Sequence, residues 1–374
     1  MKQTNGSFCV SLALTAAVLC AGMLAGCQAP PIGNPKIAVN LPAERNSPDG
    51  MVLGKDGNMY LSTFNFGDKT VPGAIMYIDK NDKLSKFVEL PDHPDTERTC
   101  PLGIDFASDG NLYVADAQAI VGAEGAISRL LKVTIAGGKP VSVETVVDGF
   151  NFSNAVACRG DAVYVTETSL GIKDDTGVHH SGVYRFALSE LNGAKPIKLA
   201  AEGKDKHLIA RLETRNPDWA VGANGMDFDP EGNMYVCNFG EASIEKFKMN
   251  AAGTKPVSRK VFVKGQGMLC TDGMDYAADG MIYVADFLGN AVHQICPASG
   301  KVNTLAKNPV SDGTDGRLDK PSESRLRGKK VYVANIDIPY DNNVVDAPYT
   351  ISVIELTGCC KCKCCCKCPK PATK

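Results

Sequence analysis

The sequence predicts an all-β fold, a six-bladed β-propeller built from four-stranded blades. Three observations lead to this prediction. One motif, an apolar stretch followed by a glycine-containing turn and a Tyr-Val strand, occurs six times along the chain. Its copies are spaced by about the length of one propeller blade. A strand-like segment that has no repeat of its own precedes the first copy, at residues 36–41.

The repeat is clearest in two segments, GANGMDFDPEGNMYVCNFG from Gly222 and CTDGMDYAADGMIYVADFLGN from Cys270. All copies can be aligned on the aromatic residue of the Tyr-Val strand, which is Tyr60, Tyr113, Tyr164, Tyr235, Tyr283 and Tyr332. These anchors lie 48 to 53 residues apart, except for an interval of 71 residues between the third and the fourth. Such a period is typical of one four-stranded blade.

Each copy has the pattern of a β-hairpin followed by two further strands. In the fourth copy GMDFD is a short apolar strand, PEGN is a turn, and MYVCNF is rich in β-branched and aromatic residues. The segments ASIEKFKM and KPVSRKVFV follow, and their alternation of apolar and polar residues predicts two more strands.

The two ends of the repeat array are predicted to close the ring. After VYVANID the last copy contains only one further strand, YTISVIEL, so its blade is one strand short. KIAVNL, at residues 36–41, would supply the outer strand and reduce the exposed sheet edges. We therefore expect one propeller over residues 36–357. Two smaller β-domains would need a linker, and the sequence has none.

The amino terminus is predicted to lie outside the propeller. Residues 1–26 have a lysine near the start and a short apolar run, which is typical of a secretory signal peptide. The sequence Leu24-Ala25-Gly26-Cys27 resembles a bacterial lipobox, and the alternative is an ordinary signal peptide that happens to contain Cys27. A lipidated Cys27, with residues 27–35 as linker, would anchor the protein to a membrane on its extracytoplasmic side, periplasmic or cell-surface.

Composition and cysteine distribution restrict the class of protein. With 44% hydrophobic and 22% charged residues the chain can bury a large core, and a formal charge of −2 without a basic stripe gives no reason to expect nucleic acid. Five of the fifteen cysteines lie in the body, so the fold is not disulfide-dense. Seven crowd into residues 358–374, a tail that we expect to be disordered, in which soft-metal binding and oxidation are both open.

The residue that opens each repeat is the candidate functional position. In a propeller the innermost strands line the central channel, so equivalent starting positions meet at one mouth. A role in turns alone is the alternative, because Asp-Gly and Asn-Gly are strong turn signals. That role gives no reason for a glutamate in the sixth copy. The candidates are Asp49, Leu102, Asn154, Asn224, Asp272 and Glu323.

These residue types indicate a metal site. The carboxylates of Asp49, Asp272 and Glu323 would repel one another, at about 3 kcal/mol for each pair at ~6 Å and an effective dielectric of ~20. A cation bound also by the amide oxygens of Asn154 and Asn224 would remove this repulsion. Hard oxygen ligands favour Ca²⁺, with Mn²⁺, Mg²⁺ or Zn²⁺ as alternatives.

The patterns N-G-x-x-x-D-x-x-G-N-x-Y-V and D-G-x-x-x-D-x-x-G-x-x-Y-V-A resemble the repeats of the senescence marker protein/gluconolactonase family of six-bladed propellers. The resemblance covers about residues 36 to 357. It implies a divalent metal at the channel mouth, held here by Asn154, Asn224 and Asp272, and assigns Asp272 as the general base. Glu323 in KPSES resembles the family's single glutamate, which usually opens the first blade, where this chain has Asp49.

The resemblance implies a hydrolase of small lactones or related esters, in which metal-activated water attacks the carbonyl. With the lipid anchor expected at Cys27, this hydrolase would be held at a membrane surface. Leu102 is expected to face the substrate. His179 and His180 lie in the long interval between the third and fourth anchors and are further candidates for the substrate side, with solvated loop positions as the alternative. The alternative function is a non-catalytic propeller that binds a ligand or partner and holds a structural cation in its channel.

Overall fold

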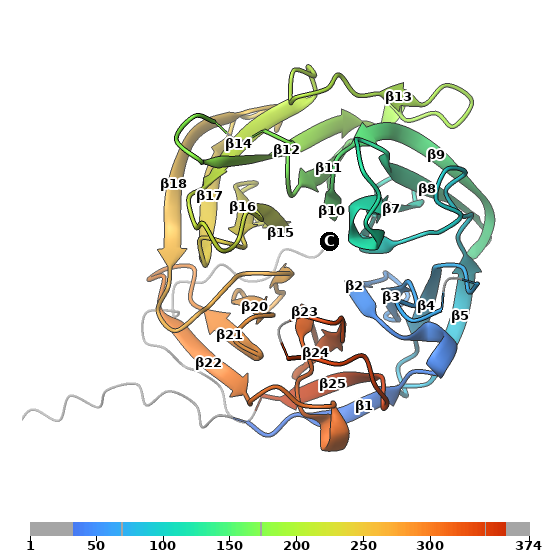
Figure 1. Ribbon diagram of the computed structural model, residues 1–374, viewed down its shortest axis with the longest axis vertical. Coiled ribbons are helices and arrows are strands. Elements are labelled where there is room, and N and C mark those ends of the chain that lie inside the picture. Colours follow the sequence, from blue (N-terminus) through green and yellow to red (C-terminus); the bar gives the residue numbers. More distant parts are fainter. Residues whose placement is uncertain (1–32, 69, 173, 341, 357–374) are drawn as a thin grey trace, which may run out of the picture.

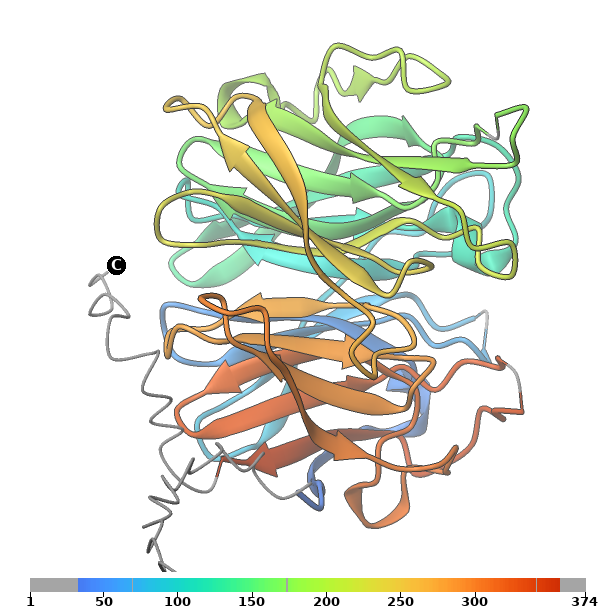
Figure 2. The same ribbon diagram turned by 90° about the vertical axis from the view of Figure 1, so that its left-hand side faces the viewer.

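The computed structural model describes residues 33–68, 70–172, 174–340 and 342–356. These residues form six sheets arranged around a central axis, which confirms the predicted six-bladed propeller (Figure 1). All of their strand pairs are antiparallel except one short parallel pair at the outer edge of blade two. Figure 2 shows the ring from its side. Within the described part of the chain, the helical elements are four short 3₁₀ helices, η1 (Ala43–Arg45), η2 (Gln118–Val121), η3 (Leu188–Glu190) and η4 (Thr314–Gly316).

The first three blades follow one another along the chain, each with its innermost strand first. Blade one consists of β2 (Pro48–Leu53), β3 (Met59–Thr63), β4 (Ala74–Ile78) and β5 (Leu84–Glu89). Blade two consists of β6 (Pro101–Phe106), β7 (Leu112–Asp116), β8 (Ser128–Ala136) and β9 (Lys139–Phe150), and the short β13 (Ile197–Lys198) adds to its outer edge. Blade three consists of β10 (Ser153–Arg159), β11 (Ala162–Glu167), β12 (His179–Ala187) and β14 (Leu208–Thr214).

The other three blades complete the ring. Blade four consists of β15 (Ala223–Phe228), β16 (Met234–Asn238), β17 (Ser243–Met249) and β18 (Pro256–Lys264). Blade five consists of β19 (Met274–Tyr276), β20 (Ile282–Asp286), β21 (Ala291–Ile295) and β22 (Val302–Lys307). Blade six consists of β23 (Pro321–Arg327), β24 (Lys330–Asn335), β25 (Thr350–Glu355) and β1 (Lys36–Asn40).

The closure of the ring by the amino-terminal strand is confirmed. β1 pairs antiparallel with β25, with Ile37 opposite Ser352 and Asn40 opposite Thr350. In Figure 1 the blue β1 lies along the outer edge of the red blade six. Because strands from the two ends of the repeat array share one sheet, the pairing of β1 with β25 closes the ring.

The repeated residues stabilise the hairpins of the blades. The anchors Tyr113 and Tyr283 are fully buried, and their hydroxyl groups donate hydrogen bonds to the turn residues Asp109 (3.0 Å) and Asp279 (2.7 Å), four positions earlier. Each aspartate also accepts a hydrogen bond from the backbone N–H two residues after it. The turn and the aromatic anchor of the repeat are therefore one structural unit.

Several predictions about the chain ends fall outside the described residues. The signal peptide, the lipidated Cys27 and the Cys-rich tail belong to these parts of the chain. The five cysteines of the body are free thiols. No helix in the described part of the chain is long and apolar enough to cross a membrane.

Candidate functional site

A cavity of about 320 Å³ lies at one end of the central channel. Five of the predicted ring residues line it: Asp49, Leu102, Asn154, Asn224 and Asp272. Four of these residues lie second in the inner strand of their blade, and Asp272 lies two residues before the inner strand of blade five. The structure thus brings together side chains from five different repeats, as the channel geometry of a propeller requires.

The sixth ring position is Ser322, and the alignment of Glu323 with the ring is off by one residue. Pro321 pairs with Asn335 and Arg325 with Tyr332, just as Ala223 pairs with Asn238 and Asp227 with Tyr235. Ser322 is therefore equivalent to Asn224 in register. The hairpin of blade six is one residue shorter than that of blade four, so its ring position lies ten residues before the tyrosine anchor, and Glu323 lies nine residues before it.

Glu323 is not among the residues that line the cavity. Its Oε1 accepts a hydrogen bond from the Ser324 N–H (2.9 Å), and its Oε2 lies 3.6 Å from Nη2 of Arg325. Burial raises the pKa of Glu323 to about 8, while Arg325 opposes this rise. The Glu323 carboxylate acts on the ring through its charge, because it raises the pKa of Asp272.

The two ring carboxylates are held in an environment that disfavours their charge. Burial raises the pKa of Asp49 to about 7, although a hydrogen bond with Ser322 lowers it. Burial, followed by the charges of Asp49 and Glu323, raises the pKa of Asp272 well above its ordinary value, and a hydrogen bond with Asn224 opposes this. Asp49 and Asp272 keep partial exposure because they face the cavity.

The donor set of the ring fits a hard cation. The cavity lining, as far as the described residues form it, contains carboxylate and amide oxygens but no lysine, arginine or histidine. A positive charge beside Asp272 would relieve the electrostatic cost of its ionised form. Within the described residues, however, Asp49, Asp272 and Glu323 do not form a trio with oxygens within 4.8 Å of one another. A cation at the ring would therefore depend on amide oxygens as well as carboxylates.

The walls of the cavity are aromatic, a feature that the sequence reasoning missed. The rings of Trp219 and Tyr340 lie 4.6 Å apart, and Phe287 lies 5.8 Å from Tyr340. Phe239, Phe287 and Ile336 each come four residues after the tyrosine anchor of their repeat. An apolar residue four positions after the tyrosine anchor is therefore the sequence signal that could have predicted these walls.

Arg325 lies on the inner strand β23, three residues after Ser322, and contacts residues of three other blades. Its Nη1 lies 3.2 Å from Oδ1 of Asp275 and 3.7 Å from Oδ2 of Asp227, and its Nε donates a hydrogen bond to the Met51 carbonyl oxygen (2.7 Å). Arg325 occupies the register position of the repeated aspartate. The aspartates also join neighbouring blades, since Asp227 accepts a hydrogen bond from the Tyr276 N–H (2.8 Å).

The long interval between the third and fourth anchors contributes Trp219 and Val221 to the cavity, in addition to the ring residue Asn224. His179 and His180 begin β12, the third strand of blade three, and neither lines the cavity. His180 instead lies with its Nε2 3.4 Å from Oδ2 of Asp174. The structure therefore does not place the two histidines at the substrate-facing position expected from the sequence.

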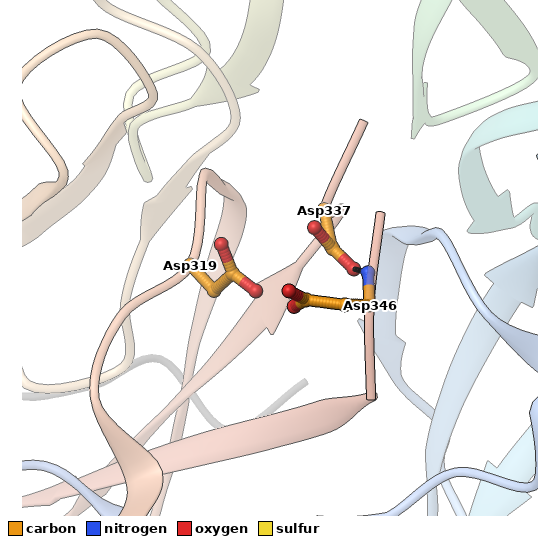
Figure 3. Close-up of side chains that lie close together, drawn as sticks. All are labelled: Asp319, Asp337 and Asp346. Carbon is orange, nitrogen blue, oxygen red and sulfur yellow. Dashed lines mark hydrogen bonds between the residues drawn. The ribbon is translucent and has the colours of Figure 1, made fainter. Parts of the chain in front are cut away.

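A second group of oxygen ligands lies in blade six. Asp319, Asp337 and Asp346 each place one carboxylate oxygen within 4.8 Å of the other two (Figure 3). Burial and the neighbouring carboxylates raise the pKa of Asp319 to about 8, and burial raises that of Asp337 to about 7. A separate surface depression of about 360 Å³ between Leu269, Leu288 and Pro309 is lined by a single ionisable residue, Lys307.

Part of the chain matches a known family of sequences. Residues 175–315, which include Asn224 and Asp272, match the family model described as SMP-30/Gluconolactonase/LRE-like region. This match confirms the resemblance predicted from the repeats, over less than half of the chain. No curated protein matches the sequence.

Solved structures share the fold over most of the chain. A gluconolactonase from Xanthomonas campestris is 14% identical and covers 88% of this chain and 99% of its own, with a TM-score of 0.53. Regucalcin from Agrobacterium tumefaciens, described as a calcium-binding protein, is 14% identical over 86% of this chain and 94% of its own, with a TM-score of 0.53. A luciferin-regenerating enzyme is 13% identical over 87% and 95%, with a TM-score of 0.55. At these identities the likeness is one of fold.

Proposed function

We propose that this protein is a metal-dependent hydrolase of lactones or related esters. The observation that carries the proposal is the convergence of Asp272, Asn224, Asn154 and Asp49 in a cavity with apolar walls. The family match over residues 175–315 and the fold shared with a gluconolactonase support the same class of reaction.

Asn154, Asn224 and Asp272, together with Asp49, are the residues that would hold the cation. Their oxygens are hard ligands and favour Ca²⁺, the ion named in the description of regucalcin. When bound, such a cation polarises a substrate carbonyl and lowers the pKa of a water molecule. The Asn224 hydrogen bond orients the Asp272 carboxylate at the same time.

Asp272 is the general base of the proposed reaction. In its ionised form it accepts a proton from the attacking water and returns it to the alkoxide oxygen of the leaving group, so that the acyl C–O bond breaks as the new one forms. Burial, Asp49 and Glu323 all oppose ionisation of Asp272, so its activity as a base requires a positive charge beside it.

The walls of the cavity favour a substrate with an apolar body. Trp219, Phe287 and Tyr340 offer aromatic surface, and Leu102 replaces a polar residue in the ring itself. A sugar-like lactone with many hydroxyl groups would leave these groups without hydrogen-bond partners against such walls, which is costly. We therefore expect alkyl or aryl lactones and esters, bound with the carbonyl group toward Asp272.

A direct assay tests this function. Purified protein lacking residues 1–26 is offered alkyl-substituted and polyhydroxylated lactones with Ca²⁺, with Mn²⁺ and after chelation. We expect hydrolysis of the alkyl lactones that is lost on chelation and reduced at least 100-fold in Asp272→Asn, since a general base contributes about 10²–10⁴-fold. The matched control is Asp218→Asn, which removes an exposed carboxylate next to Trp219 and should retain activity.

The outcomes separate the two classes of function. Hydrolysis that ignores both the chelator and Asp272→Asn contradicts the mechanism. Binding of Ca²⁺ that raises the melting temperature, without turnover of any lactone or ester, supports instead a propeller that binds a ligand and holds a structural cation.

We also propose that Cys27 carries the lipid anchor that places the enzyme on the extracytoplasmic side of a membrane. Acyl chains contribute about 0.8 kcal/mol for each buried methylene, so a multiply acylated cysteine holds a domain at the bilayer. Expression in a bacterial host should give membrane-bound protein that incorporates labelled palmitate, and Cys27→Ser should release it. Unlabelled protein that is soluble with Cys27 intact would contradict this proposal.

A further inference from the structure

Three carboxylates outside the ring meet in blade six. Asp319 precedes β23, Asp337 follows β24, and Asp346 lies on the segment that leads to β25. One oxygen of each lies within 4.8 Å of the others. Figure 3 shows the three carboxylates pointing toward one another from separate parts of the chain.

Two of these side chains have buried oxygens without a hydrogen-bond partner. Asp319 is 2% exposed, and its Oδ1 has no partner, nor has Oδ1 of Asp346. In contrast, both oxygens of Asp337 are paired: Oδ1 accepts from Nδ2 of Asn343 (2.9 Å) and Oδ2 from the Asp346 N–H (3.1 Å). Buried polar atoms in folded proteins nearly always have a partner. The two unpaired oxygens therefore indicate a ligand that accepts their lone pairs.

The charge balance around Asp319 points to a cation. Asp337, Asp346 and Asp312 all oppose its ionisation, and the positive charge that favours it comes from Lys320. The Lys320 ammonium group lies 5.0 Å from the centre of the Phe287 ring. The single positive charge of one lysine does not neutralise three carboxylates.

We propose that Asp319, Asp337 and Asp346 form a second cation site, separate from the ring, which binds a hard divalent ion such as Ca²⁺. Carboxylate oxygens at irregular positions suit Ca²⁺, which accepts six to eight oxygens in flexible geometry and completes its shell with water. The site joins two segments of blade six that no strand pairing joins directly, the one before β23 and the one between β24 and β25.

The second site has a consequence for the cavity. Ile336, Ile338 and Tyr340 line the cavity, and Asp337 lies within the same run of residues. Asp337 has a φ of 45°, a left-handed conformation that costs energy for a residue other than glycine. A cation that binds the Asp337 carboxylate would hold this run in place, and with it one aromatic wall of the cavity.

Calcium stoichiometry tests this site without reference to catalysis. Metal-free mature protein is titrated with Ca²⁺ by calorimetry, as wild type, Asp319→Asn, Asp272→Asn and the double variant. We expect two sites in the wild type, one in each single variant and none in the double variant. Asp312→Asn is the matched control: it removes an exposed charge near Asp319 that does not belong to the trio, and should bind two ions.

The design separates this proposal from the proposed function. If the ring binds no ion, the wild type takes one Ca²⁺, which is lost in Asp319→Asn and kept in Asp272→Asn, and the second site still holds. If Asp319→Asn binds as many ions as the wild type, the second site is refuted. Melting temperatures show whether the variants fold. Without metal, Asp319→Asn should melt no lower than the wild type, because the substitution relieves repulsion among the carboxylates. Ca²⁺ should raise the melting temperature of Asp319→Asn less than that of the wild type.

Discussion

The Glu323 carboxyl group of blade six lies directly against Gly273 of blade five. A Cβ atom at residue 273 would lie 2.8 Å from Cδ of Glu323 and 2.5 Å from the Ser322 carbonyl oxygen. The Gly273 N–H donates a hydrogen bond of 2.8 Å to the same carbonyl oxygen. The absence of a side chain at residue 273 therefore allows the inner strands of the two blades, and the ring that they carry, to approach one another.

Gly273→Ala should disturb this contact. The added methyl group meets backbone atoms that cannot rotate away, so we expect the free energy of unfolding to fall by about 1–3 kcal/mol, as in overpacked cores. Calcium affinity at the ring should fall as well, because Asp272 precedes the displaced strand. Urea denaturation and calorimetry measure both. Glu323→Gln, which keeps the size of the side chain, is the control and should retain the fold. Equal stability of Gly273→Ala and the wild type would contradict the importance of this close contact.

The metal-free protein should lose stability as the pH rises. The folded-state pKa of Asp49, about 7, is above the unfolded value near 3.9, so between these values the folded state binds more protons than the unfolded state. Stability from this group is complete below about pH 4 and is lost as the pH rises through 7. The melting temperature in chelator should fall from pH 5 to pH 8, and Asp49→Asn should flatten this fall.

Calcium should weaken this dependence of stability on pH. A cation at the ring competes with protons for the same carboxylates, so its stabilising effect should be larger at pH 8 than at pH 5. Melting curves at both pH values, with and without saturating Ca²⁺, provide the measurement. An equal calcium effect at the two pH values would contradict the assignment of carboxylates as ligands.

Arg325→Met should be strongly destabilising at pH 7. It leaves Asp275, Asp227 and Glu323 without their shared counter-charge, and removal of one partner from a buried ionic cluster costs about 3–5 kcal/mol. Arg317→Met, which breaks the exposed pair with Asp312 and an exposed hydrogen bond to the Thr314 carbonyl oxygen, should cost less than about 1 kcal/mol. Urea denaturation compares the two variants. Similar losses in the free energy of unfolding would contradict a special stabilising role of Arg325.

Trp219→Ala should alter substrate preference more than chemistry. Because the Trp219 ring packs against the Tyr340 ring in the cavity wall, we expect KM for alkyl or aryl lactones to rise about tenfold, equivalent to about 1.4 kcal/mol. The turnover number should change little, and Trp219→Phe should restore much of the affinity. A loss that is equal for small and large substrates would contradict the proposed role of the wall.

The predictable part of this protein follows from its repeats. The period and the Tyr-Val anchors predicted the blades and the closing strand, because each repeat folds into one local unit and the unit recurs. The ring residues Asn154, Asn224 and Asp272 could be found for the same reason. Glu323 was misaligned because the distance from the ring position to the anchor varies with the length of the hairpin turn, so the tyrosine anchor alone does not decide between Ser322 and Glu323.

Other features depend on contacts between segments outside the repeat. Asp319, Asp337 and Asp346 come from loops that approach one another only after blade six has formed, so no local pattern marks them. His179 and His180 were singled out by residue type, yet the pairing of β12 with β14 places them away from the channel axis. Trp219 reaches the cavity from the same insertion because it packs against Phe239 and Tyr340.

The most direct test of the central claim is anomalous diffraction from crystals grown with Mn²⁺, followed by replacement with Ca²⁺. The account predicts a peak at the mouth of the channel, with oxygens of Asp272, Asn224 and Asn154 at metal–ligand distances. An empty ring at saturating Mn²⁺ and Ca²⁺, in protein that hydrolyses lactones, would contradict it.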